Sequence, residues 1–126
     1  MRFMMLMIPN IKDEKWMPSA ADVAAMSKYN QELNKAGALL SLDGLHPPSK
    51  GARVSFGAGG KNTVVDGPFA EAKEVVGGYW IIQVKSKEEA VAWARRCPGS
   101  EGNVVEVRQI FELTDFPEDV QRAAGL

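Results

Sequence analysis

The stretch that organises the chain runs from Val64 to Trp80 and reads VVDGPFAEAKEVVGGYW. Its Asp66-Gly67-Pro68 triplet is a turn signal, because glycine tolerates positive φ and proline fixes its own φ. Gly77-Gly78 then breaks any local helix, and the residues from Tyr79 onward are rich in β-branched and aromatic side chains. The stretch therefore predicts a turn, a charged segment and the start of a strand.

Strand signals recur on both sides of this stretch as short apolar or alternating runs bounded by glycine, proline or asparagine. They predict strands over residues 3–8, 38–42, 53–56, 62–65, 79–85 and 104–111, the last with an irregularity near Gln109. Residues 57–61 are glycine-rich, so the third and fourth of these strands are expected to form a hairpin with an exposed tip.

Helix signals fall between the strands. Ser19 and Asp22 form a start signal for a helix that runs to about Lys35 and ends at Gly37. Its predicted buried stripe is made of Val23, Met26, Tyr29 or Asn30, Leu33 and Ala36. Ser86 and Glu89 predict a capping box for a second helix that ends near Arg96, and the residues after Thr114 favour a short final helix.

This order of elements predicts an α+β fold: a ferredoxin-like split βαβ unit with an antiparallel sheet, both helices on one face, and an inserted hairpin. The whole chain, residues 1–126, is expected to form a single domain. Because one chain has no third layer for the other face of the sheet, we expect that face to pack on a second copy in a homodimer.

Composition narrows the function classes. With 45% hydrophobic residues, 25% charged residues and a net charge of -1, the chain is typical of a globular protein, and no basic cluster predicts a nucleic-acid partner. A single cysteine, Cys97, fits a cytoplasmic location. The apolar run at residues 3–8 is too short for a signal peptide or a membrane span, so no membrane association is expected. The single histidine argues against a metal site, and no cofactor is predicted.

Charged side chains follow the turn of the central stretch. Asp66, Glu71 and Lys73 are candidates to polarise or hold a small substrate. The alternative, a turn-forming aspartate followed by a solvated charge run, is the commoner arrangement for such residues. His46 follows a predicted strand and precedes two prolines, where it is either a general base facing a cleft or an exposed loop imidazole.

Three further candidates lie on predicted strands. Glu106 and Arg108 are two residues apart on one strand, so their side chains share a face, where they either pair or bind an anionic ligand. Tyr79 opens the strand after the glycine pair. We favour pairing for Glu106 and Arg108.

The run Asp66-Gly67-Pro68-Phe69-Ala70-Glu71-x-Lys73-Glu74-x-x-Gly77-Gly78-Tyr79 resembles the DGPF-type members of the YCII-related domain family. The resemblance implies a ferredoxin-like subunit paired as a dimeric α+β barrel, and a family mostly without an assigned reaction. The broader family carries a histidine in the first helix and an aspartate after the second as a catalytic pair. Met26 and Cys97 stand at those positions here.

Two function hypotheses follow. In the first, the protein binds a small, anionic ligand in a cleft of the dimer without turnover, in a regulatory role that the resemblance links to sigma factors. In the alternative, it is a small lyase or isomerase that uses acid-base chemistry on a small carboxylic acid. His46 or Asp66 would then be the base, and Arg108 or Lys73 would hold the carboxylate. Whether the protein is an enzyme is left open.

Overall fold

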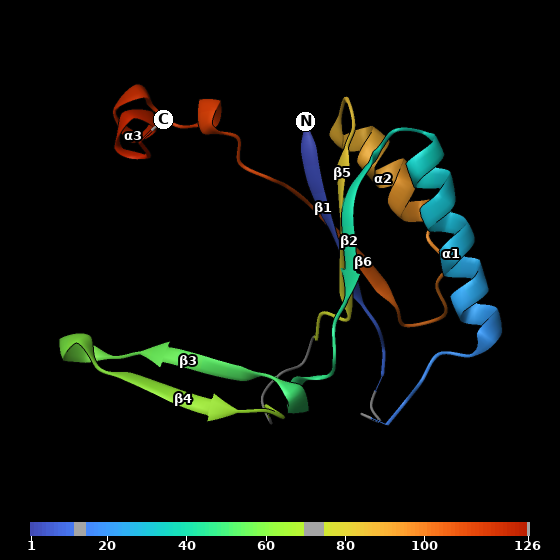
Figure 1. Cartoon of the computed structure of the whole chain (residues 1–126), viewed down its shortest axis with the longest axis horizontal. Helices are drawn as coiled ribbons and strands as arrows, with labels where there is room; N and C mark the ends of the chain where they lie inside the picture. The colour runs from blue at the N-terminus through green and yellow to red at the C-terminus, as the bar shows by residue number, and fades with distance from the viewer. Residues whose placement is uncertain (12–14, 70–74, 126) are drawn as a thin grey trace.

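A four-stranded antiparallel sheet forms the centre of the computed structural model, which describes residues 1–11, 15–69 and 75–125. Its strands are β1 (Arg2–Ile8), β2 (Leu39–Gly44), β5 (Gly78–Gln83) and β6 (Val104–Gln109), in the order β2-β5-β1-β6. Both long helices cover one face of this sheet (Figure 1). The predicted α+β class, the antiparallel sheet and the placement of the helices are therefore confirmed.

The helices begin at the predicted caps. Helix α1 (Ala20–Lys35) starts with a capping box in which Ser19 Oγ accepts from the amide of Asp22 and the Asp22 carboxylate accepts from the amide of Ser19. Helix α2 (Lys87–Arg96) starts at Ser86, whose Oγ accepts from the amide of Glu89. The capping box predicted there is incomplete, because the Glu89 carboxylate accepts from the amide of Lys85 instead, one residue before the cap.

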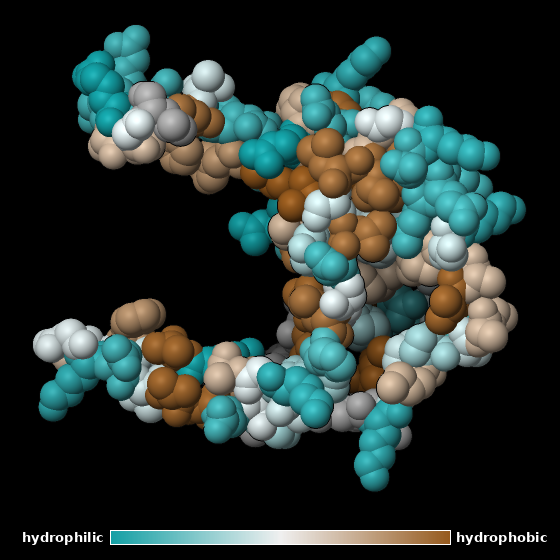
Figure 2. All heavy atoms as spheres, viewed as in Figure 1, coloured by the Kyte–Doolittle hydropathy of each residue, from teal (hydrophilic) through white to brown (hydrophobic). Residues whose placement is uncertain are grey.

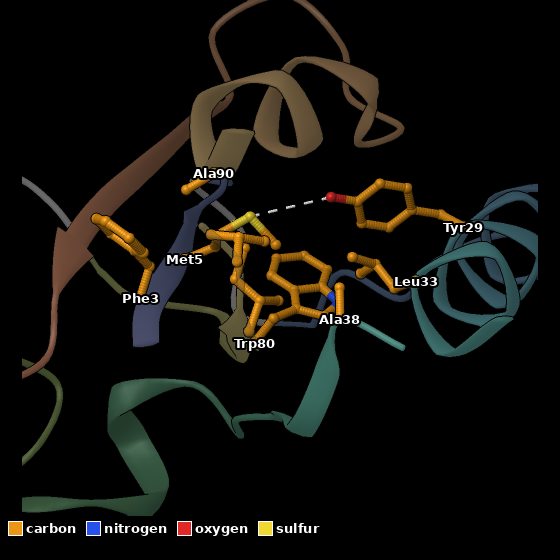
Figure 3. Packing of buried hydrophobic residues seen from close by; sticks show 9 residues of the cluster. Phe3, Met5, Tyr29, Leu33, Ala38, Trp80 and Ala90 are labelled. Carbon is orange, nitrogen blue, oxygen red and sulfur yellow. Dashed lines mark hydrogen bonds between the residues drawn. The ribbon is translucent and has the colours of Figure 1, made fainter. Parts of the chain in front are cut away.

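The core lies between the sheet and the two helices. Residues of alternating positions in β1 and β5 point toward the helices and are buried, whereas their neighbours on the other face are half-buried. The buried set comprises Phe3, Met5, Tyr29, Leu33, Ala38, Trp80, Ile82, Val84 and Ala90 (Figure 3). The stripe predicted for α1 is correct at Tyr29 and Leu33. It is wrong at Val23, which is 53% exposed, and at Ala36, which is also exposed, because α1 meets the core through its central turns only.

Two segments leave the face of the sheet that carries no helix (Figure 1). One is the predicted hairpin, β3 (Ala52–Phe56) and β4 (Asn62–Asp66), which follows the short turn η1 (Pro48–Lys50) and has η2 (Ala58–Gly60) at its tip. The other is the C-terminal segment with η3 (Leu113–Asp115) and α3 (Glu118–Ala123). Figure 2 shows an open recess between them, in front of the uncovered sheet face.

Two sequence expectations need correction in the strands and turns. The irregularity expected near Gln109 is absent, since β1 and β6 pair in regular register from Val104 to Gln109; the register shift lies in β2, between Leu39 and Ser41. The backbone of Gly67 does not have positive φ. Glycine is required there for another reason, because a Cβ on Gly67 would overlap the carbonyl group of Pro48.

The described helices are all too short or too polar to cross a membrane.

Candidate functional site

Tyr79 and Glu106 lie in one cross-strand row on the uncovered face of the sheet. Tyr79 is opposite Leu6 and Asp43, and Leu6 is opposite Glu106. The Tyr79 hydroxyl donates a hydrogen bond of 2.9 Å to Oδ2 of Asp43. This row therefore places an aspartate, a tyrosine and a glutamate across all four strands, with one leucine between them.

Arg108 lies in the next row of the same face, opposite Met4, which is opposite Ile81. The prediction that Glu106 and Arg108 share a face is confirmed. The ion pair favoured between them is absent from the described part of the chain: both side chains are exposed, and neither is within ion-pair distance of the other.

The other predicted site residues lie on connecting segments or outside the described part. His46 is exposed in the segment after β2, and Asp66 is exposed at the end of β4, opposite Ala52 at the base of the hairpin. Glu71 and Lys73 lie outside the described residues. The structure thus brings Tyr79, Glu106 and Arg108 onto one sheet face, but it places His46 and Asp66 on separate elements.

The helix-covered side of the sheet contains a cavity of about 630 Å³ that sequence reasoning did not predict. It lies between the N-terminal half of α1, the segment after β1, and the loop at residues 98–103. Its wall combines apolar and aromatic side chains with amide, hydroxyl and carboxylate groups, including Met7, Ile11, Trp16, Val23, Met26, Asp22, Asn30, Ser100, Glu101 and Asn103. A few polar groups in a largely apolar wall are typical of small-molecule sites.

The loop at residues 98–103 is held in place by its own hydrogen bonds. Oδ1 of Asn103 accepts from the amide and the hydroxyl of Ser100, at 2.8 and 3.1 Å. Gly102 has φ of 88°, and a Cβ there would lie 2.5 Å from Nδ2 of Asn10, so the loop packs closely on the segment after β1. The spacing of Ser100 and Asn103 was the one sequence signal for this wall.

On the opposite wall, α1 is fixed by a hydrogen bond of 2.8 Å from Nε1 of Trp80 to Oδ1 of Asn30. Asn30 was one of two residues left open for the buried stripe of this helix. The structure shows that Tyr29 faces the core, while Asn30 joins the sheet to the cavity wall.

A second cavity of about 490 Å³ adjoins the first, between α2 and β6. The two cavities share the wall residues Met7, Pro98, Gly99, Ser100 and Asn103. The charged residues of the second cavity are cationic, namely Lys87 and Arg95, which stand two helical turns apart on α2. The second cavity is therefore basic.

Met26 lines the larger cavity, and Cys97 lines the smaller one. Burial raises the pKa of the Cys97 thiol to about 11, so the thiol is protonated at neutral pH. Neither a thioether nor a protonated buried thiol serves as a general base or a nucleophile. Desolvation of the thiol therefore argues against a reactive Cys97.

Comparison with known proteins gives one family and one relative. The sequence profile of the YCII-related domain matches residues 1–114. An uncharacterized protein of Rhizobium meliloti (strain 1021) is 33% identical over 84 residues, which are 67% of this chain. The match spans 62% of the length of that relative.

Proposed function

The chain belongs to the YCII-related domain family, and from the geometry of its helix-covered side we propose that it binds a small molecule across the two adjoining cavities. The observation that carries this proposal is the larger cavity, whose volume of about 630 Å³ lies within the usual range for ligand sites, roughly 300–1,000 Å³. Exposed apolar side chains at its rim, Trp16 at 49% and Val23 at 53%, would be covered by a bound ligand.

The charges of the wall favour a ligand with an apolar body and an anionic group. Lys87 and Arg95 form no ion pair within the described chain, so both can bind a carboxylate or phosphate of the ligand. The apolar body would lie toward Met26 and Trp16 in the larger cavity. The anionic ligand expected from the sequence is therefore retained, but its cation is assigned to α2 instead of Arg108 on the uncovered sheet face.

Binding without turnover is favoured over a lyase or isomerase. Met26 and Cys97 occupy the positions of the catalytic pair that the family resemblance implies, and neither transfers a proton at neutral pH. The alternative bases, His46 and Asp66, are exposed on segments that do not line either cavity. A protein that binds and does not convert its ligand fits the regulatory role that the resemblance suggests.

We further propose a homodimer formed through the uncovered face of the sheet. Met4, Leu6 and Ile81 on that face are half-buried apolar residues with no helix above them, and Leu40 beside them is 49% exposed. Packing this face on its own copy would remove that apolar surface from water by two-fold symmetry. Light scattering is expected to give twice the 13.7 kDa of the chain.

A thermal-shift screen of small aromatic and aliphatic carboxylates tests the ligand proposal. A ligand at about 100 times its Kd stabilises the folded state by about 2.7 kcal/mol, which raises Tm measurably. A hit should lose affinity in Arg95→Gln and in Met26→Trp, which fills the larger cavity. The matched control is Arg108→Gln, an exposed arginine on the other side of the sheet. Equal loss in Arg108→Gln, or full affinity in Met26→Trp, would contradict the assignment.

A further inference from the structure

The β3–β4 hairpin has an apolar face that no described residue of its own chain covers. Every residue of both strands is exposed. Val54 is opposite Val64, and Phe56 follows on the same face; their side chains are 51%, 62% and 83% exposed. An isolated two-stranded hairpin is at best marginally stable in water, so this arm needs a surface to pack on.

The C-terminal segment also exposes apolar side chains and is too short to be stable by itself. Phe111, 69% exposed, stacks on Phe116 with ring centroids 4.8 Å apart, and Val120 on α3 is 41% exposed. With six residues, α3 is far shorter than the roughly 12–15 residues that give an isolated helix even marginal stability. The segment is joined to the sheet by the ion pair between Arg2 and Glu112, and it extends beyond that point along one side of the recess (Figure 1).

The two arms carry opposite charge. The hairpin and the turn before it have three basic side chains, Lys50, Arg53 and Lys61, against the single acid Asp66. The C-terminal segment from Phe111 onward, called the tail below, has one basic side chain, Arg122. Its acidic side chains are Glu112, Asp115, Glu118 and Asp119. A basic hairpin and an acidic tail attract each other, and such complementary charges fix the register of an interface.

The arms are long enough to reach across an interface between sheets. Two sheets that pack face to face lie about 10 Å apart, whereas a five-residue strand such as β3 is roughly 17 Å long. The hairpin and the tail project from opposite ends of the recess in front of the uncovered sheet face (Figures 1 and 2). Each arm would therefore pass the sheet of a second copy that filled the recess.

We infer that the tail of each copy packs on the β3–β4 hairpin of the other, so that the two arms form a reciprocal clasp around the dimer. The inference rests on the proposed homodimer and selects one of its two-fold arrangements. The alternative axis would place tail against tail and hairpin against hairpin, which brings like charges together. The clasp also supplies the hairpin with a packing surface that the described part of its own chain does not provide.

Cross-linking between differently tagged chains tests the clasp. In a Cys97→Ser background, one chain carries Asn62→Cys, on the apolar face of the hairpin opposite Phe56, and the other carries Ala123→Cys on α3. The two are co-expressed and treated with a short bismaleimide. Because each chain has one cysteine, every cross-link joins two chains, and the clasp predicts the mixed product. Cross-links between two Ala123→Cys chains without the mixed product would overturn it.

A pair of neighbouring variants provides the matched control. Val64→Ser and Val65→Ser remove similar exposed side chains, 62% and 49%, from opposite faces of the same strand. The clasp predicts that Val64→Ser raises the dimer dissociation constant by about tenfold or more, and Val65→Ser by much less. Equal increases of the dissociation constant in Val64→Ser and Val65→Ser would overturn the clasp but would leave the proposed dimer intact. A monomeric wild-type protein in light scattering would instead overturn the proposed dimer, and the clasp with it.

Discussion

The Tyr29 hydroxyl donates a hydrogen bond of 2.7 Å to the backbone carbonyl of Trp93, and this bond joins α1 to α2 over the core. The Tyr29 ring also meets the rings of Trp80 and Trp93 edge to face, with centroids 5.9 and 6.4 Å away. Burial raises the pKa of the Tyr29 phenol, so the hydroxyl keeps its proton and acts as a donor at neutral pH and well above it.

Tyr29→Phe should lower the free energy of unfolding by about 1 kcal/mol or more, because a partly buried carbonyl loses its donor. Urea denaturation measures the loss. Tyr79→Phe is the control: it removes a tyrosine hydroxyl whose bond to Asp43 is exposed, and its effect should be smaller. A larger loss in Tyr79→Phe would contradict the view that α1 and α2 depend on this link.

Gly67→Ala should destabilise the turn after the hairpin, since the new Cβ would overlap the Pro48 carbonyl and force a backbone shift. Overpacking of this kind typically costs roughly 1–3 kcal/mol. Gly44→Ala is the matched control, because a Cβ there has no neighbour within 4 Å and Gly44 does not have positive φ. Thermal unfolding of both variants should show a clear loss for Gly67→Ala only.

Cys97 should react slowly with iodoacetamide while the protein is folded. A pKa of about 11 leaves roughly one thiol in a thousand ionised at pH 8, against about a quarter for an unperturbed cysteine. Alkylation, followed by mass spectrometry, should therefore be slower in the folded protein than in urea by a factor on the order of a few hundred. Rapid modification of the folded protein at pH 8 would show that the thiolate is stabilised and would reopen a nucleophilic role.

The link between Arg2 and Glu112 should weaken in acid. The guanidinium donates bonds of 2.7 and 3.2 Å to the carboxylate and lowers the pKa of Glu112. The stabilisation is therefore complete above the unfolded-state pKa, about 4.3, and is lost as the pH falls through the lower folded-state pKa. Because both side chains are exposed, the expected readout is local.

Hydrogen exchange measures that local effect. Protection of the amides at residues 112–116 should fall below about pH 4 in the wild type and should already be low at pH 7 in Glu112→Gln. The Arg122 and Glu118 pair, at 3.9 Å and more exposed, provides the control in Glu118→Gln. A Glu112→Gln protein with wild-type protection would show that the tail is held by other contacts.

The succession of elements was predictable because its signals are local. Ser19 and Ser86 bond to amides three residues ahead, and Gly37, with φ of 71°, ends α1 as expected. For other glycines, the contact that excludes a side chain comes from a segment distant in the sequence, so it could not be predicted. Gly78 lies where a Cβ would be 2.9 Å from the Asp43 carbonyl, a contact made only when β5 pairs with β2.

The candidate site was harder to predict, because its wall comes from distant segments. Met7, Asn30 and Asn103 belong to a strand, a helix and a loop, and each looks ordinary in the sequence. The alternation of β6 did place Glu106 and Arg108 on one face, but it could not show that the cavities lie on the other. Periodicity gives a side chain its face, whereas a cavity depends on how well the layers fill the space between them.

The pairing of Gly44 with Gly78 has a consequence for the engineering of this chain. These two residues are opposite each other at the ends of β2 and β5, so the chain leaves the sheet after Gly44 and returns to it at Gly78. The Leu45 amide donates to the Gly77 carbonyl at 2.9 Å, so the two ends of this excursion lie side by side, and we expect that it can be exchanged as one unit. A chain in which a two-residue Asn-Gly turn joins Gly44 to Gly78 would close β2 and β5 into a simple hairpin and provide a minimal scaffold.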